Sequence, residues 1–342
     1  IYQVVEMAIE MYLLSKKVDY AIILIFTTMI RTLAYICCNR TVFKEYPWLK
    51  KVKIKPKDRF CDVGYMFWHK ISGTIKMNTD IIILSITQSP LVVTIYSSYN
   101  YIIKCLSQIV YLLSTSISSS AGNVFYKENE KKKSEVFDKI NITFLYLSAV
   151  ITVILCIEYD DFITIWIGNK YIMGKFSKVI LCITLFQTVA SRSLILAYET
   201  MGKYKETKWI VAAEAIINLV LSIILVKPFG MFGVILATAI SGIVSIVVLP
   251  KYIYTNIFNQ GYKKYLFQYS FVFLITIGIM IAYEVLRNRF VFNITILSFA
   301  LSAIINSMII VIFITIIFMI VFKEFRDLLK SYVFAFKEKK RK

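Results

Sequence analysis

The sequence predicts an all-α polytopic membrane protein, and three observations support this prediction. Of its 342 residues, 58% are hydrophobic and only 18% are charged, whereas soluble domains have roughly 45–50% apolar and about 25% charged residues. The mean hydropathy is +0.69. Nine apolar runs reach the length of roughly 20 residues that a helix needs to cross a bilayer. The composition therefore excludes a soluble enzyme, a secreted disulfide scaffold and a free nucleic-acid-binding domain.

The nine expected spans follow one another with short connections. In chain order they lie near residues 19–38, 60–86, 91–121, 139–157, 176–200, 209–226, 229–250, 265–285 and 294–322. The run 1–14 is too short to span and is expected to be the end of a helix whose start is missing. Because every connection is short, we expect no extramembrane domain.

Positive charge is distributed unevenly over the connections, and the formal net charge is +19. One side collects 27 Lys and Arg residues from 40–59, 122–139, 202–208, 251–264 and the tail 323–342. The other side carries eight, including Lys16, Lys17 and Lys178, of which the first two oppose the trend. Lys and Arg are enriched in cytoplasmic loops, so we expect a cytoplasmic C-terminus and no nucleic-acid partner. The tail, which interleaves basic and aromatic residues, is expected either to lie on the anionic inner leaflet or to be solvated and disordered.

No cofactor or metal is expected. The six cysteines form no CxxC pair and there is one histidine, which argues against a thiolate or imidazole metal site. No Walker A, GxSxG or HExxH string is present. The sequence therefore predicts a transporter that does not use ATP, rather than an enzyme.

Four of the expected spans carry a polar face. His69, Gly73, Lys76 and Asp80 recur at helical spacing and share one face of a helix. Three further polar faces contain Asn100, Lys104 and Gln108, then Gln187, Ser191 and Arg192, and then Glu214, Asn218 and Ser222. Because lipid cannot satisfy such groups, we expect these faces to line a shared water-accessible cavity, with Arg31 and Asn78 as further candidates.

Each of these residues also has a purely structural interpretation. Hydrogen bonds between polar stripes hold membrane helices together, and Lys76 and Asp80, one turn apart, could neutralise each other. Glu214 could bind a proton or sodium ion, or pair with Arg192. Lys104 has no acid on its own helix, which favours a role in a cavity.

Several strings resemble one known family. Asn78-Thr79-Asp80-Ile81-Ile82-Ile83 is followed by Tyr96-Ser97-Ser98-Tyr99, and later strings lie at 166–171, 202–205, 218–226 and 229–234. In order and spacing they resemble helices seven to twelve of the Wzx-type bacterial polysaccharide flippases. That family belongs to the superfamily of the MATE exporters and the peptidoglycan-precursor flippases.

The resemblance implies a MATE-like two-lobe helical bundle, of which this chain would hold the second lobe and the last helices of the first. Residues 1–59 would then be the end of the first lobe and a central cytoplasmic loop. Residues 60–250 would form the second six-helix lobe, 251–322 two extra transmembrane helices, and 323–342 a basic cytoplasmic tail.

The resemblance also implies a function, namely flipping undecaprenyl-pyrophosphate-linked oligosaccharide across the bacterial cytoplasmic membrane by alternating access, for capsule or exopolysaccharide synthesis. Cations for the pyrophosphate would come from Arg31, Lys76, Lys104 and Arg192, and contacts to the sugars from Asn78, Asn100 and Gln108. The implied partners are the lipid-linked oligosaccharide, membrane lipid, and the polysaccharide polymerase and chain-length proteins.

Two other classes of protein stay open. A MATE-like ion-coupled exporter would prefer an acidic cavity, whereas cations outnumber acids within these spans. A polysaccharide polymerase or ligase would need a large outer loop with catalytic charges, and the longest expected outer loop, 158–175, is small.

Overall fold

The computed structural model describes residues 2–47, 60–287 and 295–339, and this part of the chain is helical with no strand. The all-α prediction is confirmed for these residues. The helices are α1 (Tyr2–Ser15), α2 (Tyr20–Glu45), α3 (Phe60–Thr87), α4 (Pro90–Lys127), α5 (Glu130–Trp166), α6 (Lys175–Ala190), α7 (Arg192–Thr200), α8 (Tyr204–Tyr252), α9 (Lys263–Arg287), α10 (Ile296–Val321) and α11 (Lys323–Lys339).

Seven helical stretches of the described chain are long and apolar enough to cross a membrane, so the protein is a multi-pass membrane protein. They account for eight of the nine expected spans, because the stretch that contains α8 holds two of them. The ninth, expected at 60–86, forms α3 but does not meet this measure, since Lys76, Asn78 and Asp80 lower its hydropathy.

Residues Ile1–Phe60 and Cys61–Lys342 form two compact units, and each is considered by itself. In the first unit, α1 and α2 pack side by side. The Asp19 carboxylate accepts a hydrogen bond from the backbone N–H of Ala21 at 2.8 Å and so caps the start of α2. An ion pair of 2.5 Å between Glu6 and Arg31 joins the two helices.

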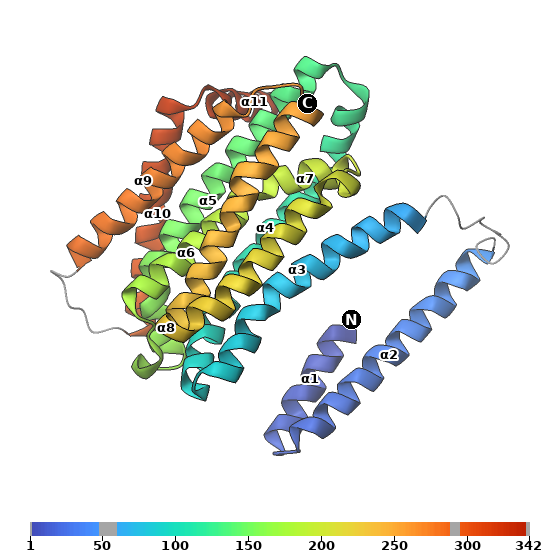
Figure 1. Cartoon of the computed structure of the whole chain (residues 1–342), viewed down its shortest axis with the longest axis vertical. Helices are drawn as coiled ribbons and strands as arrows, with labels where there is room; N and C mark the ends of the chain where they lie inside the picture. The colour runs from blue at the N-terminus through green and yellow to red at the C-terminus, as the bar shows by residue number, and fades with distance from the viewer. Residues whose placement is uncertain (1, 48–59, 288–294, 340–342) are drawn as a thin grey trace. The chain divides into compact units, whose positions relative to one another are not determined.

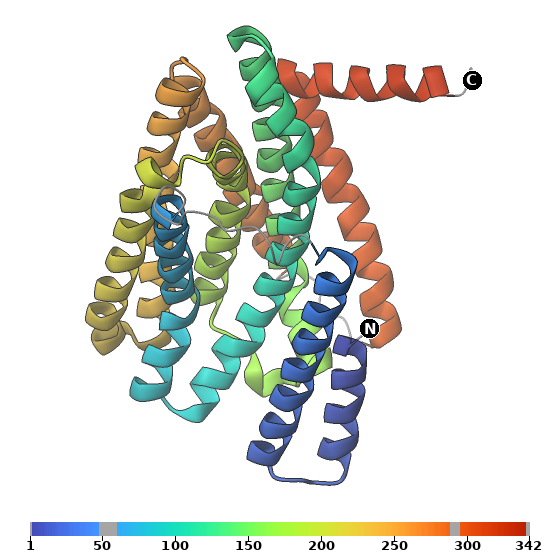
Figure 2. The same cartoon turned by 90° about the vertical axis from the view of Figure 1, so that its right-hand side faces the viewer.

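Helix α5 forms the centre of the second unit (Figures 1 and 2). It packs against α4, α6, α9 and α10 and buries side chains around its circumference, among them Phe144, Ala149 and Val150. A helix that is apolar on all sides has to be surrounded by others. The last two membrane helices therefore share the core of the helices that precede them.

Helix α8 is a hairpin of two antiparallel halves, 204–229 and 231–252. The chain reverses at Gly230, whose φ of 55° and ψ of −133° suit glycine and strain other residues. Gly233 lies so close to the first half that an added Cβ would be 2.1 Å from the Leu225 carbonyl oxygen. The separate spans expected at 209–226 and 229–250 correspond to these two halves.

Helix α5 is longer than expected at its C-terminal end. It continues to Trp166, so most of the expected outer loop 158–175 is helical or lies in the short turn Asn169–Tyr171. The expectation was wrong because Glu158, Asp160 and Asp161 end the apolar run without ending the helix. Instead, Asp160 pairs with Lys178 and Glu158 accepts a hydrogen bond from Asn306.

Three of the basic connections meet at the same end of the second unit. Lys264 at the start of α9 pairs with Asp138 of α5 at 2.6 Å and with Glu324 of α11 at 2.7 Å. Ser134 donates to the Phe258 carbonyl at 3.3 Å. The sorting of basic connections to one side, expected from the sequence, therefore agrees with their positions in this unit.

The expected tail is a helix over 323–339, so these residues are not a disordered segment. Helix α11 runs across the end of α10 (Figure 2). Arg326 donates to the Met319 and Ile320 carbonyls at 2.9 and 2.8 Å, which satisfies the last turn of α10. Phe325 is buried against Phe318 and Tyr146.

Candidate functional site

The first part of the candidate site is an ion pair between α3 and α8. Lys76 of α3 contacts the Glu214 carboxylate of α8, which also accepts a hydrogen bond from Ser245 on the other half of the hairpin. Glu214 is only 5% exposed, so its charge depends on this cation. The suggested neutralisation of Lys76 by Asp80 and the suggested pairing of Glu214 with Arg192 were therefore wrong.

The second part of the site lies one turn further along α3. The Asp80 carboxylate, 5% exposed, accepts hydrogen bonds from the Tyr96 hydroxyl of α4 at 2.8 Å and from the Thr238 hydroxyl of α8 at 2.9 Å. The Asn218 amide donates to the same Thr238 hydroxyl at 2.9 Å. The structure thus brings four residues of the expected set together in two neighbouring groups, Lys76 with Glu214 and Asp80 with Asn218.

A polar stripe on α4 lies beside these two groups. Asn100 and Lys104 are partly buried and Gln108 is exposed. Among the residues that the structure describes, Lys104 has no ion pair, although its charge and that of Lys76 both act on Asp80. This stripe is therefore available to a charged or hydroxyl-rich ligand.

Arg192 belongs to a different cluster. As the first residue of α7, it donates to Ser114 of α4 at 2.9 Å and pairs with Glu199 at 2.6 Å, two turns along its own helix. Its guanidinium also lies 4.9 Å from the centre of the Tyr111 ring. These contacts engage Arg192 outside the Asp80 and Glu214 groups and tie α7 to α4.

The two remaining candidates make other contacts. Arg31 belongs to the first unit, where it pairs with Glu6. Asn78 is exposed, and its amide donates to the Thr74 carbonyl of its own helix at 2.9 Å. The helical spacing that brings Lys76 and Asp80 to one face of α3 turns Asn78 away from it.

The sequence analysis missed one buried cluster. Lys178, assigned to an outer connection, is 1% exposed and pairs with Asp160 at 2.7 Å. Tyr99 donates to Asp160 at 2.8 Å and accepts from the backbone N–H of Met173 at 3.1 Å. The cluster holds α4, α5 and α6 together, and its only sequence signal was a lysine at the start of an otherwise apolar run.

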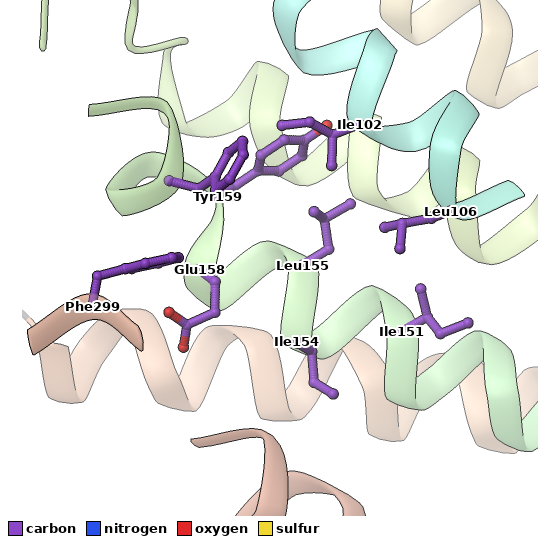
Figure 3. A pocket seen from close by; sticks show the side chains of 9 residues that line it. Ile102, Leu106, Ile151, Ile154, Leu155, Glu158, Tyr159 and Phe299 are labelled. Carbon is purple, nitrogen blue, oxygen red and sulfur yellow. The ribbon is translucent and has the colours of Figure 1, made fainter. Parts of the chain in front are cut away.

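A cavity of about 330 Å³ opens between α4, α5 and α10 (Figure 3). Its lining residues are Ile102, Leu106, Ile151, Ile154, Leu155, Glu158, Tyr159, Phe162 and Phe299. Glu158, the only acidic side chain among them, accepts a hydrogen bond from Asn306 at 2.8 Å. An apolar cavity of this kind suits a hydrocarbon chain.

Comparison with protein-family models, with curated proteins and with solved structures found no match to this chain. The fold and the site together define an all-α multi-pass membrane protein with buried polar contacts between α3, α4 and α8. Beside them lies Lys104, which makes no ion pair with any described residue.

Proposed function

We propose that this chain belongs to a transporter that flips undecaprenyl-pyrophosphate-linked oligosaccharide repeat units across the bacterial cytoplasmic membrane. The observation that carries the proposal is Lys104. A cation within a membrane helix costs roughly 2.5–3.5 kcal/mol to insert, and this one has no ion pair among the described residues. A pyrophosphate group would supply the missing negative charge.

The surroundings of Lys104 suit the rest of such a substrate. Asn100 and Gln108 share its stripe on α4 and offer amide donors and acceptors for sugar hydroxyls. The side chain of Lys76 is 33% exposed despite its ion pair, so a second cation is accessible nearby. The apolar cavity between α4, α5 and α10 provides space for part of a polyprenyl chain.

The transport step in this proposal is alternating access, in which one bundle of helices rocks against another around a fixed site. The C-terminus lies in the cytoplasm, as the basic connections favour. The oligosaccharide units are released at the outer leaflet, where the polysaccharide polymerase and chain-length proteins take them over.

The test replaces Lys104 in cells and measures the leaflet in which undecaprenyl-linked repeat units accumulate. Lys104→Ala should trap complete units in the inner leaflet, because the pyrophosphate loses its cation, while membrane insertion stays normal. Lys104→Arg should retain export. Lys70→Ala removes an exposed cation of α3 and is the matched control. A wild-type leaflet distribution in Lys104→Ala would refute the proposal.

A second candidate is a MATE-like ion-coupled exporter of small molecules, which the buried acids Asp80 and Glu214 favour. Deletion of the gene distinguishes the two, because loss of an exporter leaves both leaflet pools of lipid-linked sugar unchanged. A polymerase or ligase is the least supported class, since only 167–174 separate α5 from α6.

A further inference from the structure

Helix α11 has an apolar row that is longer than the part of the helix that lies on the bundle. Phe325 is buried against Phe318 and Tyr146, and Leu329, one turn further, packs against the same core. At helical spacing, a tyrosine at position 332 and a phenylalanine at position 336 continue this row. In Figure 2 the second half of α11 extends beyond the end of α10 and away from the core.

One flank of α11, beside the apolar row, is basic. Lys323, Lys330 and Lys337 follow one another at intervals of seven residues, which is close to two helical turns, so they share one side of the helix. Lys323 and Lys330 are exposed, and neither makes an ion pair with a described residue. Glu324 of the same helix is neutralised by Lys264 of α9 at 2.7 Å. The flank therefore carries positive charge that the bundle does not balance.

The position of α11 places this flank at a membrane surface. Helix α10 is long and apolar enough to cross a membrane and ends at Val321, and α11 begins at Lys323 and runs across that end (Figure 2). The face of α11 that packs on the bundle therefore points back toward the bilayer. An apolar face with Lys and Arg residues beside it is typical of a helix that lies in the plane of the headgroups.

We propose that α11 binds the surface of a leaflet that contains anionic phospholipid, and that Lys323, Lys330 and Lys337 supply the attraction to the lipid phosphates. Anionic headgroups attract basic residues that lie close to the membrane, and the attraction falls off within a Debye length. An acidic protein would match the charge alone. A lipid surface matches both the charge and the apolar row, because headgroups and hydrocarbon lie side by side there.

Such binding would fix the ends of two membrane helices. Arg326 of α11 donates to the Met319 and Ile320 carbonyls of α10, and Glu324 of α11 pairs with Lys264 of α9. Lipid that holds α11 in place therefore also holds these contacts together. Leaflet charge would in this way stabilise the end of the bundle at which α9 begins and α10 ends.

The experiment compares the purified full-length protein in nanodiscs of phosphatidylcholine alone and in nanodiscs with an equal share of phosphatidylglycerol. Hydrogen exchange of the α11 amides should be about tenfold slower with the anionic lipid at low salt. High salt should remove this difference, because it screens the attraction. The triple variant Lys323→Gln/Lys330→Gln/Lys337→Gln should exchange at nearly the same rate in both lipids.

Two controls separate this attraction from a general effect of charge. The variant Lys127→Gln/Lys131→Gln/Lys205→Gln removes the same charge from exposed lysines outside α11, so its α11 should respond to anionic lipid like that of the wild type. Amides 128–135, around the start of α5, are the internal reference, because a lower pH near an anionic surface would slow exchange in both segments alike.

The proposal is overturned if wild-type α11 exchanges equally fast in both lipids, if amides 128–135 slow as much as α11, or if the two triple variants respond alike. If the substitutions in α11 leave it unfolded in both lipids, the salt dependence of the wild type decides the question. No lipid-linked sugar is present, so the outcome is independent of the proposed flippase activity.

Discussion

Of the polar contacts in the site, the ion pair between Lys76 and Glu214 should be the most sensitive to a single substitution. Lys76→Met should destabilise the protein by about 1–3 kcal/mol, because Glu214 is left buried without its partner. The double variant Lys76→Met/Glu214→Gln should recover most of this loss, since it removes the charge as well. Thermal unfolding of the purified protein measures both. A double variant no more stable than the single one would contradict this explanation.

At the residue scale, helical spacing was sufficient to find the site but not its pairings. Lys76, Asp80, Glu214 and Asn218 could be singled out because charges and amides are rare within apolar runs. Which acid contacts which cation depends on how far one helix is shifted along another, and the spacing within a helix contains no such information. For this reason the pairing of Lys76 on α3 with Glu214 on α8 was not foreseen.

At the scale of elements, the reversal within α8 depends on Gly230. Gly230→Ala should destabilise the protein by about 1–3 kcal/mol, because a side chain is strained at this positive φ. Gly174→Ala is the matched control, since Gly174 has a negative φ of −57° and nothing within 4 Å of an added Cβ. Equal unfolding temperatures for the two variants would show that the turn tolerates alanine.

The stability of helix α11 should depend on pH, because its residue Glu324 forms an ion pair with Lys264. Burial raises the pKa of Glu324, but hydrogen bonds and the charges of Lys264 and Lys323 outweigh it, and the net pKa lies below its ordinary value of 4.5. A lowered pKa in the folded state means that the contact stabilises at neutral pH and is lost as the pH falls through that pKa. Hydrogen exchange of the α11 amides, corrected for intrinsic rates, should therefore accelerate in acid.

The control for this pH effect is Glu324→Gln. This variant should show faster exchange than the wild type at pH 7 and a smaller further acceleration on acidification, because its side chain does not titrate. If wild-type and variant α11 exchange at the same rate at pH 7, the pair with Lys264 contributes nothing to holding the helix.

The elements themselves were largely predictable from the sequence. Apolar runs located the helices, and the positions of Lys and Arg indicated which ends lie together. The end of α5 was missed because Asp160 and Asp161 interrupt its apolar sequence, and only the three-dimensional structure supplies Lys178 as the partner of Asp160. The break between α6 and α7 at Ser191 was also missed, since no proline or glycine marks it.

At the scale of the whole molecule, the proposed cavity can be mapped by its access to water. Gln108→Cys should react with a membrane-impermeant maleimide, because the polar stripe of α4 faces water in the proposed transporter. The adjacent Ile109→Cys is the matched control. Ile109 is also exposed in the described unit, but an apolar exposed face is expected to contact lipid, where a charged reagent does not enter.

This comparison requires a background in which Cys61 and the exposed cysteines Cys37, Cys38 and Cys105 are replaced by serine. Equal labelling at positions 108 and 109 would mean that α4 has no face that water reaches selectively. Composition predicted a polytopic protein, but it could not predict which faces of α4 the bundle leaves open, because that depends on the packing of all the helices together.

The hairpin of α8 also has a consequence for how the protein is made. Its turn is so tight that the two halves have to enter the bilayer as one unit rather than in succession. Asn218 and Thr238 can then pair as soon as residue 252 has left the ribosome, before α9 has followed it into the membrane. The polar side chains of α8 would thus be shielded from lipid during synthesis by the hairpin's own second half, and the hairpin would present Thr238 and Glu214 to the already inserted α3.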